Sequence, residues 1–196
     1  MRVFYDFEFL EHQVNYGHWP RRRSAWTVEP LSIGVKVEDG REFYAVWRDA
    51  PWHLVRKHEW LMDNVVPQLS RLAGDQRNHA PSSWLFNMAA PEVKPGWQIA
   101  NELGTFLQGI PDIELWGWYC AFDHVSLAWI WGKMMDLPEG VPMYTNDLKQ
   151  RCARLGNPNL NVQQQGEHNA LEDARENERR AYQLDRLEKH MEAFEL

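Results

Sequence analysis

Cysteine is scarce in this sequence of 196 residues, which has only Cys120 and Cys152. The two are far apart and do not form the closely spaced pair of a typical metal site. We therefore expect two free thiols, as in proteins of a reducing cytoplasm.

Long hydrophobic runs are also absent. The longest candidate, residues 113–122, contains Glu114 and is too short for the roughly 20 residues that cross a bilayer. The sequence begins with a strand-like segment and shows no signal-peptide pattern. We expect no membrane association and a cytoplasmic location.

Positive charge is the third deficit. Lysine and arginine number 21 against 28 acidic residues, which gives a formal net charge of −7. This balance argues against a broad electropositive surface that would bind a nucleic-acid backbone. It does not exclude a nucleic-acid enzyme, because acids that hold divalent cations count toward the same total.

Tryptophan, in contrast, is abundant, with eleven residues. Most of them, such as Trp116, Trp129 and Trp131, lie in apolar segments. We expect these in the core or in a subunit interface, which would allow a homodimer. A minority could stack on nucleic-acid bases.

The order of the expected elements indicates an α/β fold in one domain, residues 1–196. Residues 2–10, 31–37 and 41–46 have strand composition. The Asp39–Gly40 pair predicts a hairpin, so that three antiparallel strands open the chain, and helices alternating with at least one more strand then cover the faces of a mixed sheet. These later elements are an interrupted helix at 53–72, a strand at 112–119 and helices at 97–107, 121–131, 146–155 and 169–192, with loops at 11–30, 73–95 and 156–166.

The first strand carries two acidic residues, Asp6 and Glu8. Residues two apart in a strand point to the same face, so both carboxylates project from one side of the sheet. In an apolar strand this arrangement is costly unless a positive group lies between the acids. The alternative is an edge strand whose acids both face water.

Three later residues could join this pair. Asp123 opens a helix after the strand at 112–119, and that strand would bring it near Asp6 if the two strands are neighbours. An acid in the first turn of a helix can also simply complement the helix dipole. His168 and Asp173 lie at the entry of the last helix, where His168 could fold back over Asp173. Both could instead be surface residues of a charged helix.

A basic run, Arg21, Arg22 and Arg23, lies within the loop predicted at 11–30. Such a run is commonly a solvated turn. It could also act as a flap that grips phosphates beside the acidic strand.

Taken in order, these residues resemble the DEDDh 3′→5′ exonucleases, which carry Asp-x-Glu on a first strand, a helix-opening Asp in mid-chain and His-x4-Asp at a late helix. The resemblance extends from Asp6 to Asp173. Segment 31–34, Leu-Ser-Ile-Gly, is similar to the second strand of the family, and segment 168–175 is similar to its third motif. The resemblance implies a ribonuclease H-like fold.

Within this superfamily, segments 5–9, 115–118 and 122–125 look most like the small exoribonuclease AS of mycobacterial type, which trims adenosine-rich RNA 3′ ends. The chain departs from the superfamily at Phe7 and Phe9, where many members have threonine at the first or at both positions. The two long loops, 11–30 and 73–95, also exceed the expected length. These departures affect substrate contacts rather than the metal site.

The resemblance implies a hydrolase that releases nucleoside 5′-monophosphates from the 3′ end of single-stranded RNA with two Mg²⁺ or Mn²⁺ ions. Asp6 would contact both ions, and Glu8 and Asp173 would complete one site. Asp123 would support the other ion, largely through water, and His168 would be the general base for the attacking water. Carboxylate oxygens suit such hard cations, and a pair of ions can clamp a scissile phosphate.

Candidates for substrate contacts are Phe9 and Trp118, which could stack on the terminal base, together with Ser32 and the three arginines of the basic run. Two alternative functions stay open. The same chemistry could act on single-stranded DNA, because sugar recognition depends on a 2′-hydroxyl contact. The chain could also be a non-catalytic nucleic-acid-binding module, although such a module has no need of all five acidic and histidine positions.

Overall fold

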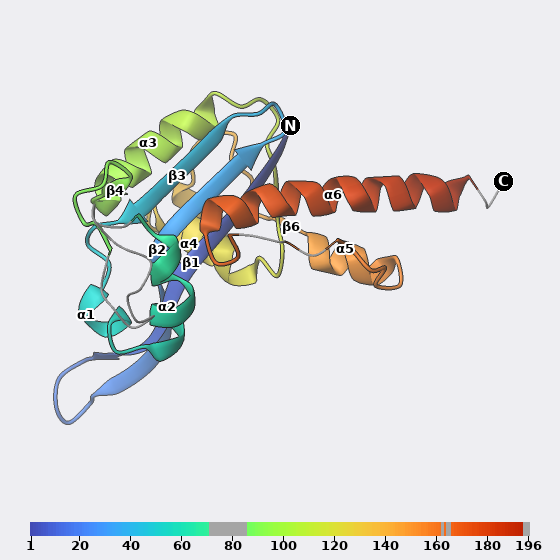
Figure 1. Cartoon of the computed structure of the whole chain (residues 1–196). Helices are drawn as coiled ribbons and strands as arrows, with labels where there is room; N and C mark the ends of the chain where they lie inside the picture. Colours follow the sequence, from blue (N-terminus) through green and yellow to red (C-terminus); the bar gives the residue numbers. More distant parts are fainter. Residues whose placement is uncertain (71–85, 162, 164–165, 194–196) are drawn as a thin grey trace.

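The computed structural model describes residues 1–70, 86–161, 163 and 166–193. Within this part of the chain, six strands form one sheet in the order β4-β3-β2-β1-β5-β6 (Figure 1). The first three strands are antiparallel neighbours, whereas β5 runs parallel to β1, β6 to β5 and β4 to β3. The predicted mixed sheet is confirmed. The strands are β1 (Arg2–Tyr16), β2 (Arg23–Val37), β3 (Glu42–Trp47), β4 (Val93–Lys94), β5 (Glu114–Gly117) and β6 (Asn146–Asp147).

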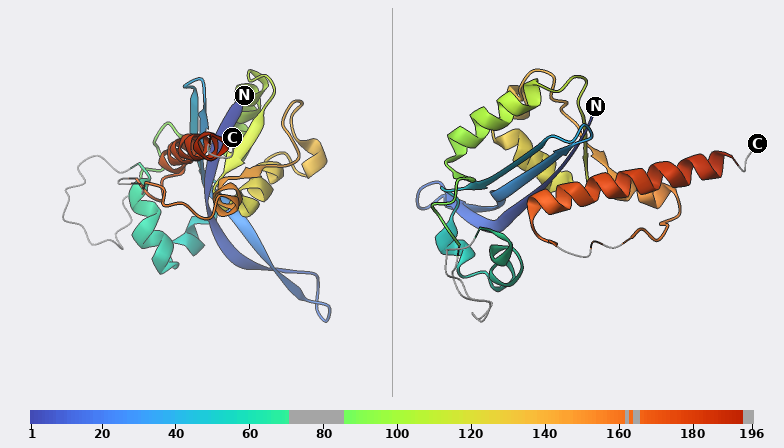
Figure 2. Two further views of the ribbon diagram at one scale, coloured as in Figure 1. Left: turned by 90° about the vertical axis from the view of Figure 1, so that its right-hand side faces the viewer. Right: turned by 45° about the horizontal axis from the view of Figure 1, so that its top comes forward.

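Helices cover both faces of the sheet, as expected (Figures 1 and 2). The helices α3 and α4 pack on one face, and the long helix α6 runs along the opposite face with α5 beside it. The short helices α1 and α2 lie near the lower end of the sheet in Figure 1. The bounds are α1 (Trp52–Val55), α2 (Glu59–Asn64), η1 (Val66–Gln68), α3 (Gly96–Gln108), α4 (Ala121–Trp129), η2 (Met134–Asp136), α5 (Leu148–Arg154) and α6 (Ala170–Glu192).

Alternation along β1 assigns its side chains to different clusters. Tyr5 and Phe7 are buried in the cluster that includes α3 and α4. Phe4 is buried against α5 and α6, and Leu10 is buried against α1 and α2. The two acidic residues of the strand lie between Phe4 and Leu10, so their carboxylates interrupt the packing between two apolar clusters.

The loop predicted at 11–30 is wrong. β1 and β2 continue as a paired two-stranded ribbon as far as Tyr16 and Arg23, and this ribbon projects from the sheet (Figures 1 and 2). Most of its side chains are exposed or partly exposed on both faces. The alternation that identifies a half-buried strand is therefore missing from its sequence.

Other boundaries differ less. The interrupted helix predicted at 53–72 is the series α1, α2 and η1, with 71–72 outside the described residues. Of the connection predicted at 73–95, only 86–95 is described, and it contains β4. The strands β4 and β6 have two residues each and leave no period in the sequence. The helices predicted at 97–107, 121–131 and 169–192 match α3, α4 and α6 closely.

The cysteines and tryptophans give a mixed result. Cys120 and Cys152 are buried free thiols, as expected. Trp129, however, lies on the side of α4 that faces a groove next to the ribbon, and it is 53% exposed. The prediction of a core position for Trp129 is therefore wrong. In the described residues, no helix combines the length and the apolar composition needed to cross a membrane.

Candidate active site

Three carboxylates from distant parts of the chain meet at the sheet. Asp6 and Glu8 project from β1, and Asp173 comes from the first turn of α6, which packs against β1 and β2. Their oxygen atoms lie within 4.8 Å of one another. Glu8 is buried, whereas Asp6 and Asp173 are partly exposed, so the cluster is accessible from one side.

Asp123 reaches the same strand from α4. β5 lies beside β1 and leads into this helix, whose first turn contains Asp123. The pairing of β1 with β5 ends at Phe4 and Trp116, which leaves the backbone N–H of Phe7 free to donate to Asp123 Oδ1 at 2.8 Å. Asp123 is only 7% exposed. The strand order therefore places this acid next to β1, as its position after β5 leads one to expect.

His168 lies just before α6 with a left-handed backbone conformation, φ +67°. Its backbone N–H donates to Asp173 Oδ2 at 2.9 Å, so the main chain folds back over this carboxylate. The imidazole packs edge-on against the ring of Trp60 from α2, with 4.9 Å between the ring centres. Backbone and ring contacts together fix where the imidazole lies.

The start of α6 is held by Asn169. Its side-chain oxygen accepts hydrogen bonds from the backbone N–H groups of Leu171 and Glu172, which is the usual geometry of a helix N-cap. Its side-chain nitrogen donates to the carbonyl oxygen of Gln68 at 3.1 Å, which ties the helix start to η1. These bonds of Asn169 thus fix the start of α6, next to His168 and Asp173.

Burial raises the pKa of all four carboxyl groups, and repulsion from neighbouring carboxylates of the cluster adds to this for Asp6 and Glu8. Burial raises the pKa of Glu8 to about 8, with smaller contributions from Asp173 and Asp123. Burial also raises the pKa of Asp123 to about 7, although a backbone N–H partly offsets this. Burial and then the other three carboxylates hold the pKa of Asp6 well above its ordinary range. The pKa of Asp173 is raised by burial.

This donor set suits a hard divalent cation. The clustered oxygens offer several carboxylate ligands around one point, which is the preference of Mg²⁺ and Mn²⁺. None of the four carboxylates forms an ion pair with another of the described residues. A cation would offset the repulsion that raises the pKa of Asp6 and Glu8.

Two relatives show the family to which the chain belongs. No family model matches the chain. Two 3′-5′ exoribonucleases of Mycobacterium tuberculosis, from strains CDC 1551 and H37Rv, are each 37% identical to it over 182 residues, which is 92% of this chain and 90% of each relative. The chain belongs to this 3′-5′ exoribonuclease family.

Two predicted RNA contacts in this family member lie near the carboxylates. Phe9 is partly exposed and packs against Phe122 of α4, with 6.0 Å between the ring centres, and Phe122 is 52% exposed beside Asp123. Trp118 is partly exposed, and its ring lies 4.6 Å from the guanidinium carbon of Arg180. Both rings could therefore take part in substrate binding.

The other predicted contacts lie elsewhere. Ser32 is fully buried opposite Glu8 on β2, so it has no surface for a direct contact with RNA. Arg21, Arg22 and Arg23 are exposed at the tip of the ribbon. Ten residues of strand separate Asp6 from Tyr16 at that tip, which is roughly 30 Å at the usual rise per residue. The predicted flap beside the acidic strand is therefore wrong in position.

Three neighbours of the site, Trp60, Phe122 and Arg180, were not predicted from the sequence. Trp60 beside His168 left no signal, because its helix is short and distant in the chain. Phe122 adjoins Asp123 and could have been found from that adjacency. Arg180 follows Asp173 by seven residues, which is about two helical turns, so the two share a helix face.

Proposed function

We propose that residues 1–196 act as one metal-dependent 3′-5′ exoribonuclease domain of the DEDDh type. The observation that carries this proposal is the meeting of the Asp6, Glu8 and Asp173 oxygens within 4.8 Å, with Asp123 and His168 adjoining. The relatives named 3′-5′ exoribonuclease support the reaction class. The similarity of the motif segments to exoribonuclease AS supports adenosine-rich RNA ends as the substrate.

The carboxylates would hold two divalent cations, Mg²⁺ or Mn²⁺, which supply positive charge to the scissile phosphate and to the leaving oxygen. Asp6, Glu8 and Asp173, whose oxygens lie within 4.8 Å of one another, would hold these ions. Asp123, which accepts the backbone N–H of Phe7 through one oxygen, would support them. The partly exposed side of the cluster provides the approach for RNA.

His168 takes the proton from the attacking water in this reaction. The water oxygen forms a bond to phosphorus, and the bond from phosphorus to the 3′ oxygen of the preceding nucleotide breaks. That oxygen takes a proton from solvent and becomes the new 3′ hydroxyl of the RNA, and the terminal nucleoside 5′-monophosphate leaves. The contact with Trp60 and the backbone bond to Asp173 hold the imidazole in place during this step. An ordered base avoids the entropic cost of finding the water.

The proposal is tested with RNA labelled at the 5′ or the 3′ end and incubated with Mg²⁺, Mn²⁺ or EDTA. We expect a ladder that shortens from the 3′ end, early release of a labelled mononucleotide, and no reaction in EDTA. A DNA of the same sequence tests whether the enzyme prefers ribose or deoxyribose. Adenosine-rich and mixed-sequence RNAs of equal length test its base preference. Internal cleavage, or full activity in EDTA, would contradict the proposal.

A homodimer stays a prediction. Sedimentation over a range of protein concentrations tests it directly.

A further inference from the structure

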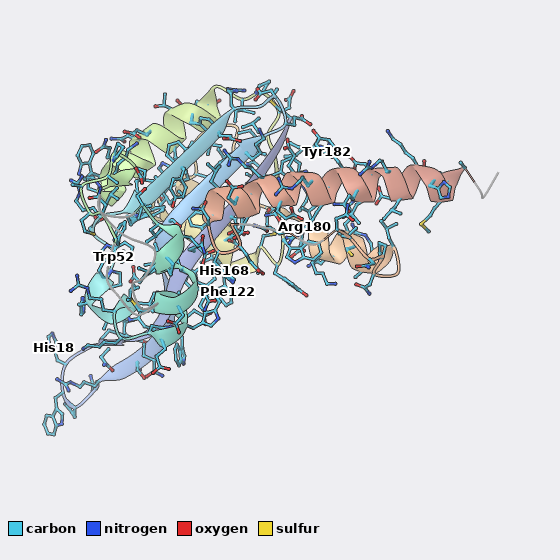
Figure 3. The ribbon with its side chains drawn as sticks, in the orientation of Figure 1. His18, Trp52, Phe122, His168, Arg180 and Tyr182 are labelled. Carbon is cyan, nitrogen blue, oxygen red and sulfur yellow. The ribbon has the colours of Figure 1, made fainter. Side chains whose placement is uncertain are left out.

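Arg180 is a cation beside the carboxylate cluster that, among the described residues, forms no ion pair with the cluster. It follows Asp173 by two turns of α6, and its side chain is largely buried, 21% exposed. Its positive charge lowers the pKa of both Asp6 and Asp173 against the larger effect of burial, so it lies within electrostatic range of them. Figure 3 shows Arg180 projecting from α6 on the side of His168 and Phe122.

The position of the guanidinium is fixed on several sides. Its carbon lies 4.6 Å from the centre of the Trp118 ring, within the range of a cation–π contact. One terminal nitrogen donates to Asn177 Oδ1 at 3.2 Å, and Asn177 in turn donates to the backbone carbonyl of Tyr5, next to Asp6. These contacts use few of the five N–H donors of the group. The arginine is therefore oriented but retains donors for a ligand.

The local charge leaves this cation available. Glu176 is buried and lies near two arginines, 2.7 Å from Arg179 and 3.7 Å from Arg180, so the three groups together carry one net positive charge. A second cation, the Lys149 ammonium, lies 5.6 Å from the same Trp118 ring. Four ionised carboxylates are neutralised by two divalent ions, which leaves the positive charge around Arg180 unmatched. A phosphodiester carries the one negative charge that would match it.

We propose that Arg180 donates to a non-bridging oxygen of the 3′-terminal phosphodiester, and that Trp118 positions the guanidinium rather than stacking on the base. The proposal rests on the proposed exoribonuclease function and adds a phosphate-binding residue outside the acidic and histidine positions. An arginine suits this role, because its rigid fork matches the geometry of phosphate oxygens.

The test is equilibrium binding of AMP and of adenosine to wild type and variants in the presence of Mn²⁺. AMP carries the phosphate that the reaction leaves on the product, and adenosine lacks it. R180Q should weaken AMP binding by about 10–100-fold, the range for a hydrogen bond to a charged group, and leave adenosine binding unchanged. R186Q is the control, because Arg186 is an exposed arginine of the same helix outside the group of Glu176, Arg179 and Arg180, and it should change neither affinity.

Four further variants test the positioning role of Trp118 and guard against a variant that fails to fold. R180K keeps the charge but loses the fork, and we expect an intermediate loss of AMP affinity. W118L should weaken AMP binding as R180Q does, whereas W118F should retain most of it. The double variant R180Q/W118L should bind AMP no worse than R180Q alone, since both changes remove one interaction. A loss of adenosine affinity in W118L would return Trp118 to base stacking and overturn the positioning role.

If R180Q has the same ratio of AMP affinity to adenosine affinity as wild type, the proposal is overturned. In that case tighter Mn²⁺ binding by R180Q would identify the arginine as a counter-charge for the carboxylates alone. The outcome is separable from the proposed function: wild type that fails to degrade RNA contradicts the exoribonuclease assignment, whereas active wild type with an unchanged R180Q ratio contradicts only the phosphate contact.

Discussion

Gly34 of β2 and Ala170 at the start of α6 are in direct backbone contact. A Cβ atom built on Gly34 would lie only 2.2 Å from the carbonyl carbon and oxygen of Ala170. Gly34 also pairs with Asp6 in the β1–β2 register. The missing side chain therefore lets the first turn of α6 approach the sheet where Asp6 lies, and this approach brings Asp173 and His168 to the first strand.

Gly34→Ala should accordingly disrupt the site. Backbone atoms cannot move aside as a flexible side chain can, so the start of α6 must shift away from the sheet. We expect loss of nuclease activity and a lower melting temperature. Gly104→Ala in α3 is the matched control, because its added Cβ would meet nothing closer than 3.7 Å, and alanine favours a helix. Equal activity of Gly34→Ala and wild type would show that the close approach is unnecessary.

Asp6→Asn, Asp123→Asn and Asp173→Asn should each abolish RNA degradation while the protein still folds, since these acids hold charge rather than fill the core. Asp39→Asn, at the exposed turn between β2 and β3, is the control and should keep full activity. The measurement is the initial rate on 5′-labelled RNA, with circular dichroism to verify folding. More than a few per cent of the wild-type rate in one variant would remove that residue from the site.

Mn²⁺ should raise the melting temperature of the wild type. A cation that binds the folded site but hardly the unfolded chain contributes about 2.7 kcal/mol at a hundredfold excess over Kd, or roughly 5–10 °C for a chain of this size. Asp6→Asn should lose most of this shift, and in EDTA it should melt no lower than wild type because one repelling charge is gone. A wild type with no Mn²⁺ shift would contradict the metal site.

Glu8→Gln should stabilise the metal-free protein in a pH-dependent way. The pKa of Glu8 is about 8 in the folded protein, above its unfolded value, so the folded state binds its proton more tightly. The stability of the wild type in EDTA should therefore fall as the pH rises from about 5 to 8, while glutamine carries no such penalty. We expect the difference in melting temperature between the two proteins to grow by several degrees over this interval. Glu11→Gln, on the exposed ribbon, should show no such growth.

His168→Ala should lower the rate of RNA degradation by roughly 10²–10⁴-fold, the usual contribution of a positioned general base. The Mn²⁺ shift of the melting temperature should persist, because the proposed ligands are carboxylates. His18→Ala, near the tip of the ribbon (Figure 3), is the control and should leave the rate unchanged. A rate near that of wild type in His168→Ala would assign the base to another group.

Replacement of Arg21, Arg22 and Arg23 with serine tests the ribbon tip. Roughly 30 Å from Asp6, these residues could contact only the upstream part of a long RNA. We expect weaker binding and a smaller salt dependence for a long RNA, and no change for a dinucleotide. If the variant binds the long RNA as tightly as wild type does at every salt concentration, the three arginines form only a solvated turn.

Local sequence patterns were enough to predict several elements and the candidate site residues. Strand composition and the Asp39–Gly40 turn gave the first hairpin, the period of 97–107 and 169–192 gave two of the helices, and the order of acids and histidine singled out the residues of the candidate site. Strand composition, the turn and the helical period can be predicted because each depends on residues close together in the chain, and the order of the acids and the histidine is a property of the sequence itself.

The contacts between groups far apart in the chain depend on how the elements pack. The hydrogen bond from the Phe7 N–H to Asp123, the packing of Trp60 on His168 and the contact of Arg180 with Trp118 each join separate elements of the chain. The length of the ribbon likewise could not be predicted from the sequence, because strands exposed on both faces have no hydrophobic period. Such contacts follow from strand order and helix packing, which no local pattern encodes.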